Sequence, residues 1–231
     1  MAERHILEGN PPIEVELREH PRARRLTLRV AARDGRVTLT MPRGTRVSKA
    51  LDFARERREW ILNHVSRVAP EEGVQIGGTV PVDGKELTLV PGAVRAPRVE
   101  ANTLIVPRRA AVAPGRTIAG FLKVRARDRL TEASDRYAAA LGRSYARISL
   151  RDTRTRWGSC SSAGALMYSW RLAMAPPDVL DYVAAHEVSH LVEMNHSPAF
   201  WAVVEGLCPA YDAHRRWLRE HGTALQRIVL D

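Results

Sequence analysis

The sequence has few cysteines, few aromatic residues and no long hydrophobic run. Two cysteines in 231 residues, Cys160 and Cys208, exclude a small secreted domain held together by a disulfide framework. No apolar stretch approaches the length of a transmembrane helix, and residues 1–5 lack the apolar core of a signal peptide. These absences predict a cytoplasmic protein with no membrane partner.

Charge of one sign is in excess. The net charge is +10 at pH 7, and arginine far outnumbers lysine. Such a balance favours polyanionic partners, namely nucleic acid, nucleotides or an anionic membrane surface, but a solvated basic surface explains it equally well. The 45% of hydrophobic residues is ample for the core of one large domain or two small ones.

The first part of the chain reads as short strands with one helix. Alternating apolar residues predict strands at 13–17, 26–30 and 37–41. Helical spacing then predicts a helix from about residue 47 to 68, with Trp60 in its packed stripe. Short strands separated by glycine-containing turns follow between residues 79 and 106.

No internal repeat stands out in this pattern. The Ala- and Pro-containing stretch at 108–115 is the best candidate boundary between two halves. We therefore divide the chain into a β-rich N-terminal half with one amphipathic helix, residues 1–111, and a second half, residues 112–231.

The second half begins with the longest predicted helix, residues 116–141, which ends at Gly142. The other face of this helix is rich in arginine and could face a polyanion, but solvated charge is the commoner explanation of such a face. Strand-like segments at 146–155 and 164–172 flank a turn-rich segment, and apolar residues alternate in the second of them as if only one face were buried. The chain ends with two predicted helices, 197–207 and 209–221, the second terminated by Gly222.

The sequence His186-Glu187-Val188-Ser189-His190 (HExxH) is the strongest functional signal. Positions four apart lie on one face of a helix, so the imidazoles of His186 and His190 can converge on one zinc ion, with Glu187 available as general base. His196 completes a three-histidine set and leaves the fourth position for water. The chain must turn before His196, and Asn195 tolerates the left-handed conformation that such a turn uses.

Alternatives to a catalytic zinc site remain open. The motif also occurs by chance in a pair of ordinary surface or core histidines. Cys160 is a possible fourth metal ligand, which would close the site and make the zinc structural, or a reactive thiol, but a small buried cysteine is more often simple packing. His214 is a further polar group near the site that we expect to be structural.

Several separated motifs together resemble one known family. They are, in order, Arg156–Ser161 (RWGSCS), Trp170–Leu172 (WRL), Asp181–His190 and Asn195–Trp201. This set is similar to the YgjP-like family of metal-dependent hydrolases, which is related to the SprT-like and WLM zinc peptidases.

The resemblance implies an α+β protein with a zincin-like (minigluzincin) core, in which the active-site helix packs on a small sheet. It also implies one continuous domain over about residues 13–222, zinc ligands at His186, His190 and His196, and a Glu187 that polarises water. The spacing is also that of metzincins, but Glu193 occupies the place of their turn glycine and no methionine turn follows.

We therefore predict a zinc-dependent hydrolase, specifically a metallopeptidase with one Zn²⁺ per chain, although imidazole sites also accept nickel, cobalt or copper. Its predicted substrate is a peptide or protein, in a narrower hypothesis one associated with nucleic acid. Two alternatives remain open at this stage. One is a metal-dependent nucleotide phosphohydrolase resembling a UTP pyrophosphatase, and the other is a basic nucleic-acid-binding protein with a structural zinc.

Overall fold

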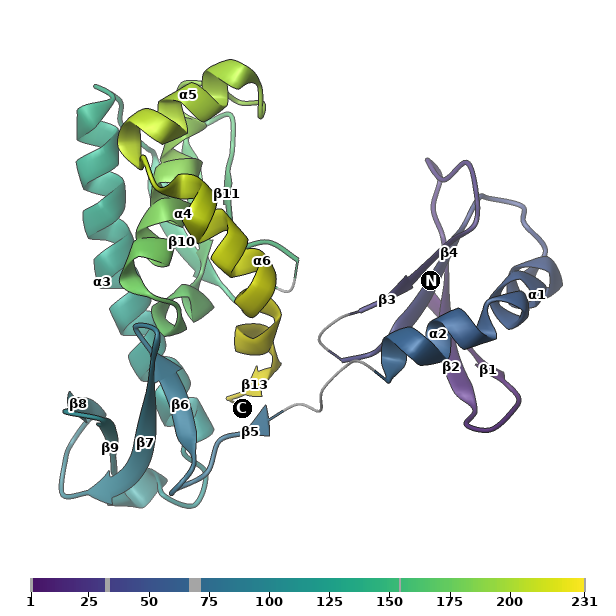
Figure 1. Cartoon of the computed structure of the whole chain (residues 1–231), viewed down its shortest axis with the longest axis horizontal. Helices are drawn as coiled ribbons and strands as arrows, with labels where there is room; N and C mark the ends of the chain where they lie inside the picture. The colour runs from purple at the N-terminus through teal and green to yellow at the C-terminus, as the bar shows by residue number, and fades with distance from the viewer. Residues whose placement is uncertain (1, 32–33, 67–71, 154, 231) are drawn as a thin grey trace. The chain divides into compact units, whose positions relative to one another are not determined.

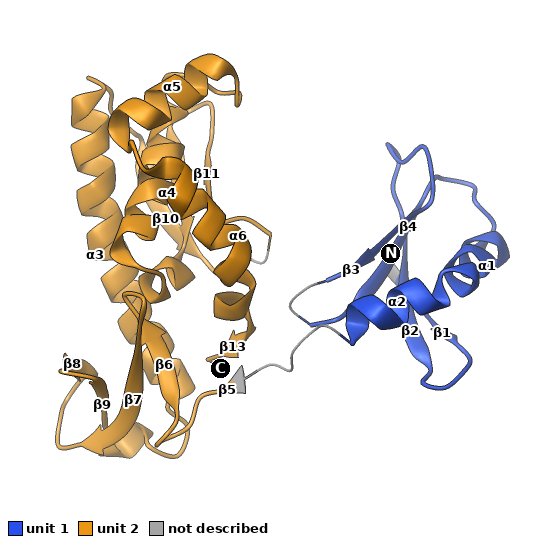
Figure 2. Ribbon diagram, viewed as in Figure 1, with its two compact units in different colours: residues 1–71 blue, residues 72–231 orange. Residues whose placement is uncertain are grey.

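A computed structural model describes residues 2–31, 34–66, 72–153 and 155–230 (Figure 1). The chain is an α+β protein that divides into two compact units, Met1–Glu71 (unit 1) and Glu72–Asp231 (unit 2), coloured separately in Figure 2. No helix in the described ranges is both long and apolar enough to span a bilayer.

Unit 1 is a sheet with helices on one face. Its strands lie in the order β1-β2-β4-β3. Pairing is antiparallel at both edges and parallel between β2 and β4. The inward residues Val15, Leu17 and Leu39 meet Ala54 and Ile61 of the helices in a separate small core. The elements are β1 (Ala2–Leu7), β2 (Ile13–Glu19), β3 (Thr27–Val30), β4 (Val37–Met41), α1 (Val47–Glu56) and α2 (Arg58–Val65).

The single helix predicted at 47–68 is instead two helices. Arg57 has non-helical dihedral angles, φ −107° and ψ 18°, and it separates α1 from α2. Residues 67 and 68 lie outside the described residues. Trp60 is 41% exposed and packs against the ring of His64, so its predicted place in the core is wrong.

Unit 2 begins with a second sheet, in the order β6-β7-β9-β8. A long helix, α3, packs on it, and Leu89, Leu104 and Val106 share one core with Ile118 and Leu122 of that helix. This shared core explains why the units divide at residue 71 and not at 111, because strands 79–107 need α3 to cover their apolar side chains. The elements are β5 (Glu72–Gly73), β6 (Thr79–Val82), β7 (Lys85–Gly92), β8 (Arg98–Glu100), β9 (Thr103–Pro107), η1 (Arg108–Ala110) and α3 (Gly115–Ala140).

The two four-stranded sheets have the same connectivity. In each, the first and second strands are antiparallel, the second and fourth are parallel, and the third pairs with the fourth. The fourth strands carry related sequences, TLTMPR at residues 38–43 and TLIVPR at residues 103–108. The chain therefore contains an internal structural repeat, which the sequence pattern alone did not reveal.

A three-stranded sheet, in the order β10-β12-β11, supports the rest of unit 2. Its central strand β12 is buried on both faces, so the predicted open face is wrong, and Trp170–Met174 form a 3₁₀ helix instead of continuing the strand. The elements are β10 (Arg147–Arg151), β11 (Gly158–Cys160), β12 (Ala165–Ser169), η2 (Trp170–Met174), α4 (Pro177–Ser189), α5 (Pro198–Leu207), α6 (Tyr211–Arg227) and β13 (Ile228–Val229).

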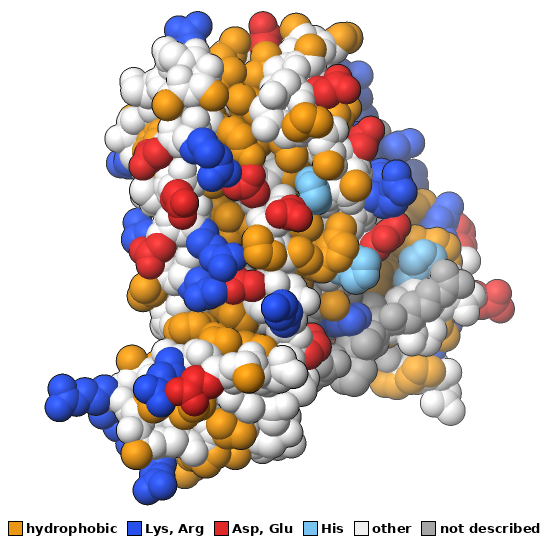
Figure 3. Space-filling model, turned by 60° about the vertical axis from the view of Figure 1, so that its left-hand side comes forward, with side chains coloured by type: hydrophobic (Ala, Val, Ile, Leu, Met, Phe, Trp, Pro, Cys, Tyr) orange, Lys and Arg blue, Asp and Glu red, His pale blue; other side chains and the backbone are white. Residues whose placement is uncertain are grey.

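Three arginines of α3 make contacts within unit 2. Arg125 and Arg129 both bind Asp83 in the β6–β7 turn, and Arg136 binds Asp181 of α4. Figure 3 shows acidic and basic side chains interspersed over the visible face of the molecule. These pairs make α3 a poor candidate for the polyanion contact that the sequence suggested.

Candidate metal centre

Helix α4 carries the first two histidines of the motif. It starts with Pro177 in its first turn and Asp178 close behind, where a fixed φ and a negative charge favour a helix start. It contacts α3, α5, α6, η2 and β11, and most of its residues are buried. His186 and Glu187 lie in its last turn, and His190 caps its C-terminal end.

The three predicted histidines converge. One ring nitrogen from each of His186, His190 and His196 lies within 4.8 Å of the others. The Nε2 atoms of His186 and His196 are 3.1 Å apart. Two nitrogens bound to one tetrahedral zinc at ~2.0–2.1 Å lie about 3.3 Å apart, so the group has the spacing of a metal site.

The turn that brings His196 back does not use the predicted left-handed residue. Asn195 has no positive φ, so that prediction is wrong. Instead, the backbone N–H of Ser197 donates to Oδ1 of Asn195 at 3.1 Å, which tightens the turn through the side chain. Ser197 then caps α5 by accepting from the N–H of Phe200, and Pro198 is the first helical residue.

Aromatic side chains of α5 pack against the three imidazoles. Phe200 is fully buried and stacks on His190 with 4.5 Å between ring centroids. Its ring also meets His186 and His196 edge-on, and Trp201 stacks on His196. Ring contacts of this kind fix the orientations of the three imidazoles.

A hydrogen bond orients the His190 ring, and burial favours the neutral form of His186 and His196. The carbonyl of Glu193 can only accept, so Nδ1 of His190 donates to it at 2.9 Å and leaves Nε2 with a free lone pair. Burial, with the neighbouring histidines and Arg215, lowers the pKa of His186 to about 3. The pKa of His196 is lowered for the same main reason. The donor set therefore fits a divalent metal ion.

Glu187 is almost completely buried beside these rings, at 5% exposure. Burial raises the pKa of its carboxyl group to about 8, against an opposing effect of Arg156. Gly158 of β11 lies directly against the carboxyl group, and a methyl group at that position would overlap Oε1. Sequence reasoning missed Gly158, because nothing local signals the contact.

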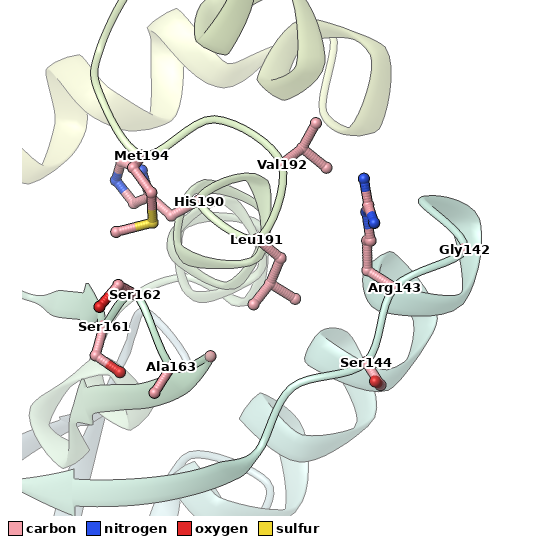
Figure 4. A pocket seen from close by; sticks show the side chains of 11 residues that line it. Gly142, Arg143, Ser144, Ser161, Ser162, Ala163, His190, Leu191, Val192 and Met194 are labelled. Carbon is pink, nitrogen blue, oxygen red and sulfur yellow. The ribbon is translucent and has the colours of Figure 1, made fainter.

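Strand β11 is an edge of its sheet, since it pairs only with β12 among the described strands. It contacts α4, so an open strand edge lies beside the histidine group. Next to His190, a cavity of about 450 Å³ is bordered by the β11–β12 turn at Ser161–Gly164 and by Arg143 (Figure 4).

The remaining candidates lie outside the histidine group. Cys160 is not among the converging side chains, and burial together with Glu187 raises the pKa of its thiol to about 11. Both facts favour simple packing for Cys160. His214 contacts Tyr182 and also stays outside the group. Arg215, which lies 4.7 Å from the Trp201 ring, was not predicted because α6 shows only an ordinary charged face.

Comparison with known proteins gives one family and one solved structure. A family model described as "YgjP-like, metallopeptidase domain" matches residues 24–221. No curated protein matches. The crystal structure of the metallopeptidase zymogen of Pyrococcus abyssi abylysin is similar at 20% identity, over 43% of this chain and 98% of that chain, with a TM-score of 0.37. At that TM-score the likeness does not define the fold of this chain.

Proposed function

The chain belongs to the YgjP-like metallopeptidase family, and from this premise we propose that it is a zinc-dependent peptidase whose ligands are His186, His190 and His196. Family membership makes the protein a metal-dependent hydrolase of the metallopeptidase type. The convergence of three imidazole nitrogens is the observation that carries the choice of ligands. Three histidines leave one position of a tetrahedral ion open, which is the arrangement of a catalytic site.

Glu187 is the general base in this proposal. Bound zinc supplies a Lewis acid that activates water for attack on a peptide carbonyl. Glu187 accepts the proton of the attacking water at its carboxylate and then delivers it to the leaving amine. A buried carboxyl with a pKa raised to about 8 supports this role, because such a group exchanges protons in both directions near neutral pH.

The surroundings of the site support an extended peptide as substrate, and the packing of α4 against β11 supports a zincin-like arrangement. The free edge of β11 can pair with a peptide backbone by strand addition. The cavity beside His190 has room for a side chain of that peptide. Among the described residues, the histidine group is the only cluster of potential metal ligands, so no acidic magnesium site favours a nucleotide substrate.

The test is metal content and hydrolysis measured on the same purified proteins. We expect about one zinc per chain in the wild type. The zinc should be largely lost in His196→Ala and retained in Glu187→Gln, and both variants should lose hydrolysis of a quenched fluorescent peptide library. His214→Ala is the matched control, because it removes a nearby histidine outside the group and should keep both metal and activity.

Three results would contradict the proposal. Full zinc in His196→Ala removes that residue from the ligand set. Peptide hydrolysis at the wild-type rate by Glu187→Gln removes the general base. If the wild type releases pyrophosphate from UTP but hydrolyses no peptide, and His190→Ala loses that release, the same centre acts on nucleotides.

A further inference from the structure

One end of the unit 1 sheet gathers positive charge. Strands β2 and β4 are parallel, so the connections that follow them leave the sheet at the same end (Figure 1). The backbone N–H of His20 donates to the carbonyl of Met41 at 3.0 Å, which holds the two connections together where they begin. Both connections, residues 20–26 and 42–46, lack acidic residues, and so does the first turn of α1.

Six cationic side chains occupy this end, and we call them the basic edge. All are exposed, and none has an ion pair or a side-chain hydrogen bond within the described part of the chain. Other arginines of the same unit, such as Arg4, Arg55 and Arg57, are paired with carboxylates. The basic edge consists of Arg22, Arg24, Arg25, Arg43, Arg46 and Lys49.

Repulsion between these like charges slightly destabilises unit 1, and no ion pair within the described part of the unit offsets it. The start of α1 adds to the positive potential, because it has no acidic residue in its first turn and no side-chain cap. An external polyanion is the natural counterpart of such a surface.

The residue types in the basic edge indicate which kind of polyanion it can bind. Guanidinium groups match phosphate oxygens in geometry as well as charge. The two connections hold no tryptophan, tyrosine or phenylalanine to stack on bases, and none of the described large exposed apolar side chains lies in them to enter a bilayer. We propose that the basic edge binds the phosphate backbone of nucleic acid without sequence preference.

The structural repeat gives independent support. The corresponding end of the unit 2 sheet again carries exposed arginines, at Arg95, Arg108, Arg109 and Arg116, in segments without acidic residues. Figure 3 shows Lys and Arg side chains projecting from the part of unit 2 formed by β6 to β9. The corresponding ends of the two sheets are therefore both basic, whereas Arg129 and Arg136, further along α3, are paired with carboxylates of unit 2.

The experiment measures binding of a fluorescent 20-nucleotide single strand and of its duplex at several salt concentrations. Affinity should fall steeply with salt, because each neutralised phosphate releases about 0.7–0.9 counterion. R22Q/R24Q/R25Q should bind at least about tenfold more weakly at low salt and reduce the slope by about 2–3. R22K/R24K/R25K, which keeps the charge, should retain most of the binding.

The matched control is R4Q/R55Q/R57Q, which changes the net charge equally at arginines that already have carboxylate partners. It should weaken binding less than about threefold. Equal losses in the two glutamine variants, a salt-independent affinity, or binding to anionic vesicles without binding to oligonucleotides would each overturn the proposal. The inference does not depend on the proposed peptidase activity, which zinc content and peptide hydrolysis report separately.

Discussion

At the scale of single residues, the position of the Glu187 carboxyl group depends on Gly158. The carboxyl group is buried, and the space it occupies exists because residue 158 has no side chain. The two residues are 29 positions apart, so the contact depends on β11 lying against α4. The spacing of His186, Glu187 and His190 could be interpreted from the sequence because a helix fixes it locally. The role of Gly158 could not, because it follows from tertiary packing.

Gly158→Ala should move the Glu187 carboxyl group and lower kcat by at least about tenfold, since small displacements of a catalytic group are costly. Zinc content should stay near that of the wild type, because the three histidines are not touched. Peptide hydrolysis and elemental analysis on the same preparation provide the measurement.

Gly120→Ala is the control, because a methyl group at this α3 position meets nothing within 4 Å. It should leave kcat unchanged and raise the free energy of unfolding by up to about 1 kcal/mol through helix propensity. Unaltered kcat in Gly158→Ala would show that Glu187 tolerates the added methyl group and that the glycine has no positioning role.

At the scale of elements, the connection between α4 and α5 decides where His196 lies. The N–H groups of Val192 and Glu193 both donate to the carbonyl of Ser189, which continues the end of α4 into a tight turn. The Ser197 cap then starts α5 immediately after His196. The histidine group is thus held between the end of α4 and the start of α5, both of which are made by local hydrogen bonds.

Ser197→Ala removes the cap of α5 and should lower the free energy of unfolding by about 1 kcal/mol. Fraying at the first turn loosens His196, so the affinity for zinc should fall by a factor of about 10. Competition with a chromophoric chelator measures the affinity, and urea unfolding measures the stability. Ser48→Ala is the matched control, because α1 has no side-chain cap hydrogen bond to lose.

Elements with a long, clear periodicity were predictable, and short or tightly packed ones were not. The helix predicted at 116–141 is present as α3, and Gly142 ends it with φ +60°. Strand β11 has only three residues, two of them glycine and serine, and the sequence suggested a turn there. Gly222 was predicted to end the last helix, but α6 continues to Arg227, and the glycine makes room for the Trp157 ring.

At the scale of the whole molecule, each unit has its own apolar core. The predicted boundary near residue 111 followed composition, whereas the core of β6 to β9 belongs with α3. The repeat escaped detection because its two copies share strand order and only one short stretch of sequence. Two separate cores predict that the units unfold in separate transitions.

Alkaline pH should separate those transitions, because all five tyrosines lie in unit 2. Burial, with nearby Asp181, raises the pKa of Tyr137 from 10.0 to about 12, and burial also raises those of Tyr145 and Tyr182 to about 12. The folded unit thus binds more protons than the unfolded unit between pH 10 and 12. The stability that these raised pKa values contribute is fully present below pH 10 and is lost as pH rises through 12.

Urea unfolding at pH 9 and pH 11.5, followed by tryptophan fluorescence, tests this linkage. In Trp60→Phe every remaining tryptophan lies in unit 2, so the variant reports that unit alone, and its difference from the wild type reports unit 1. The unit 2 midpoint should fall at the higher pH while the unit 1 midpoint stays constant, and Tyr145→Phe should reduce the fall. A parallel fall in both midpoints would mean that the units unfold together and that two cores do not give two cooperative domains.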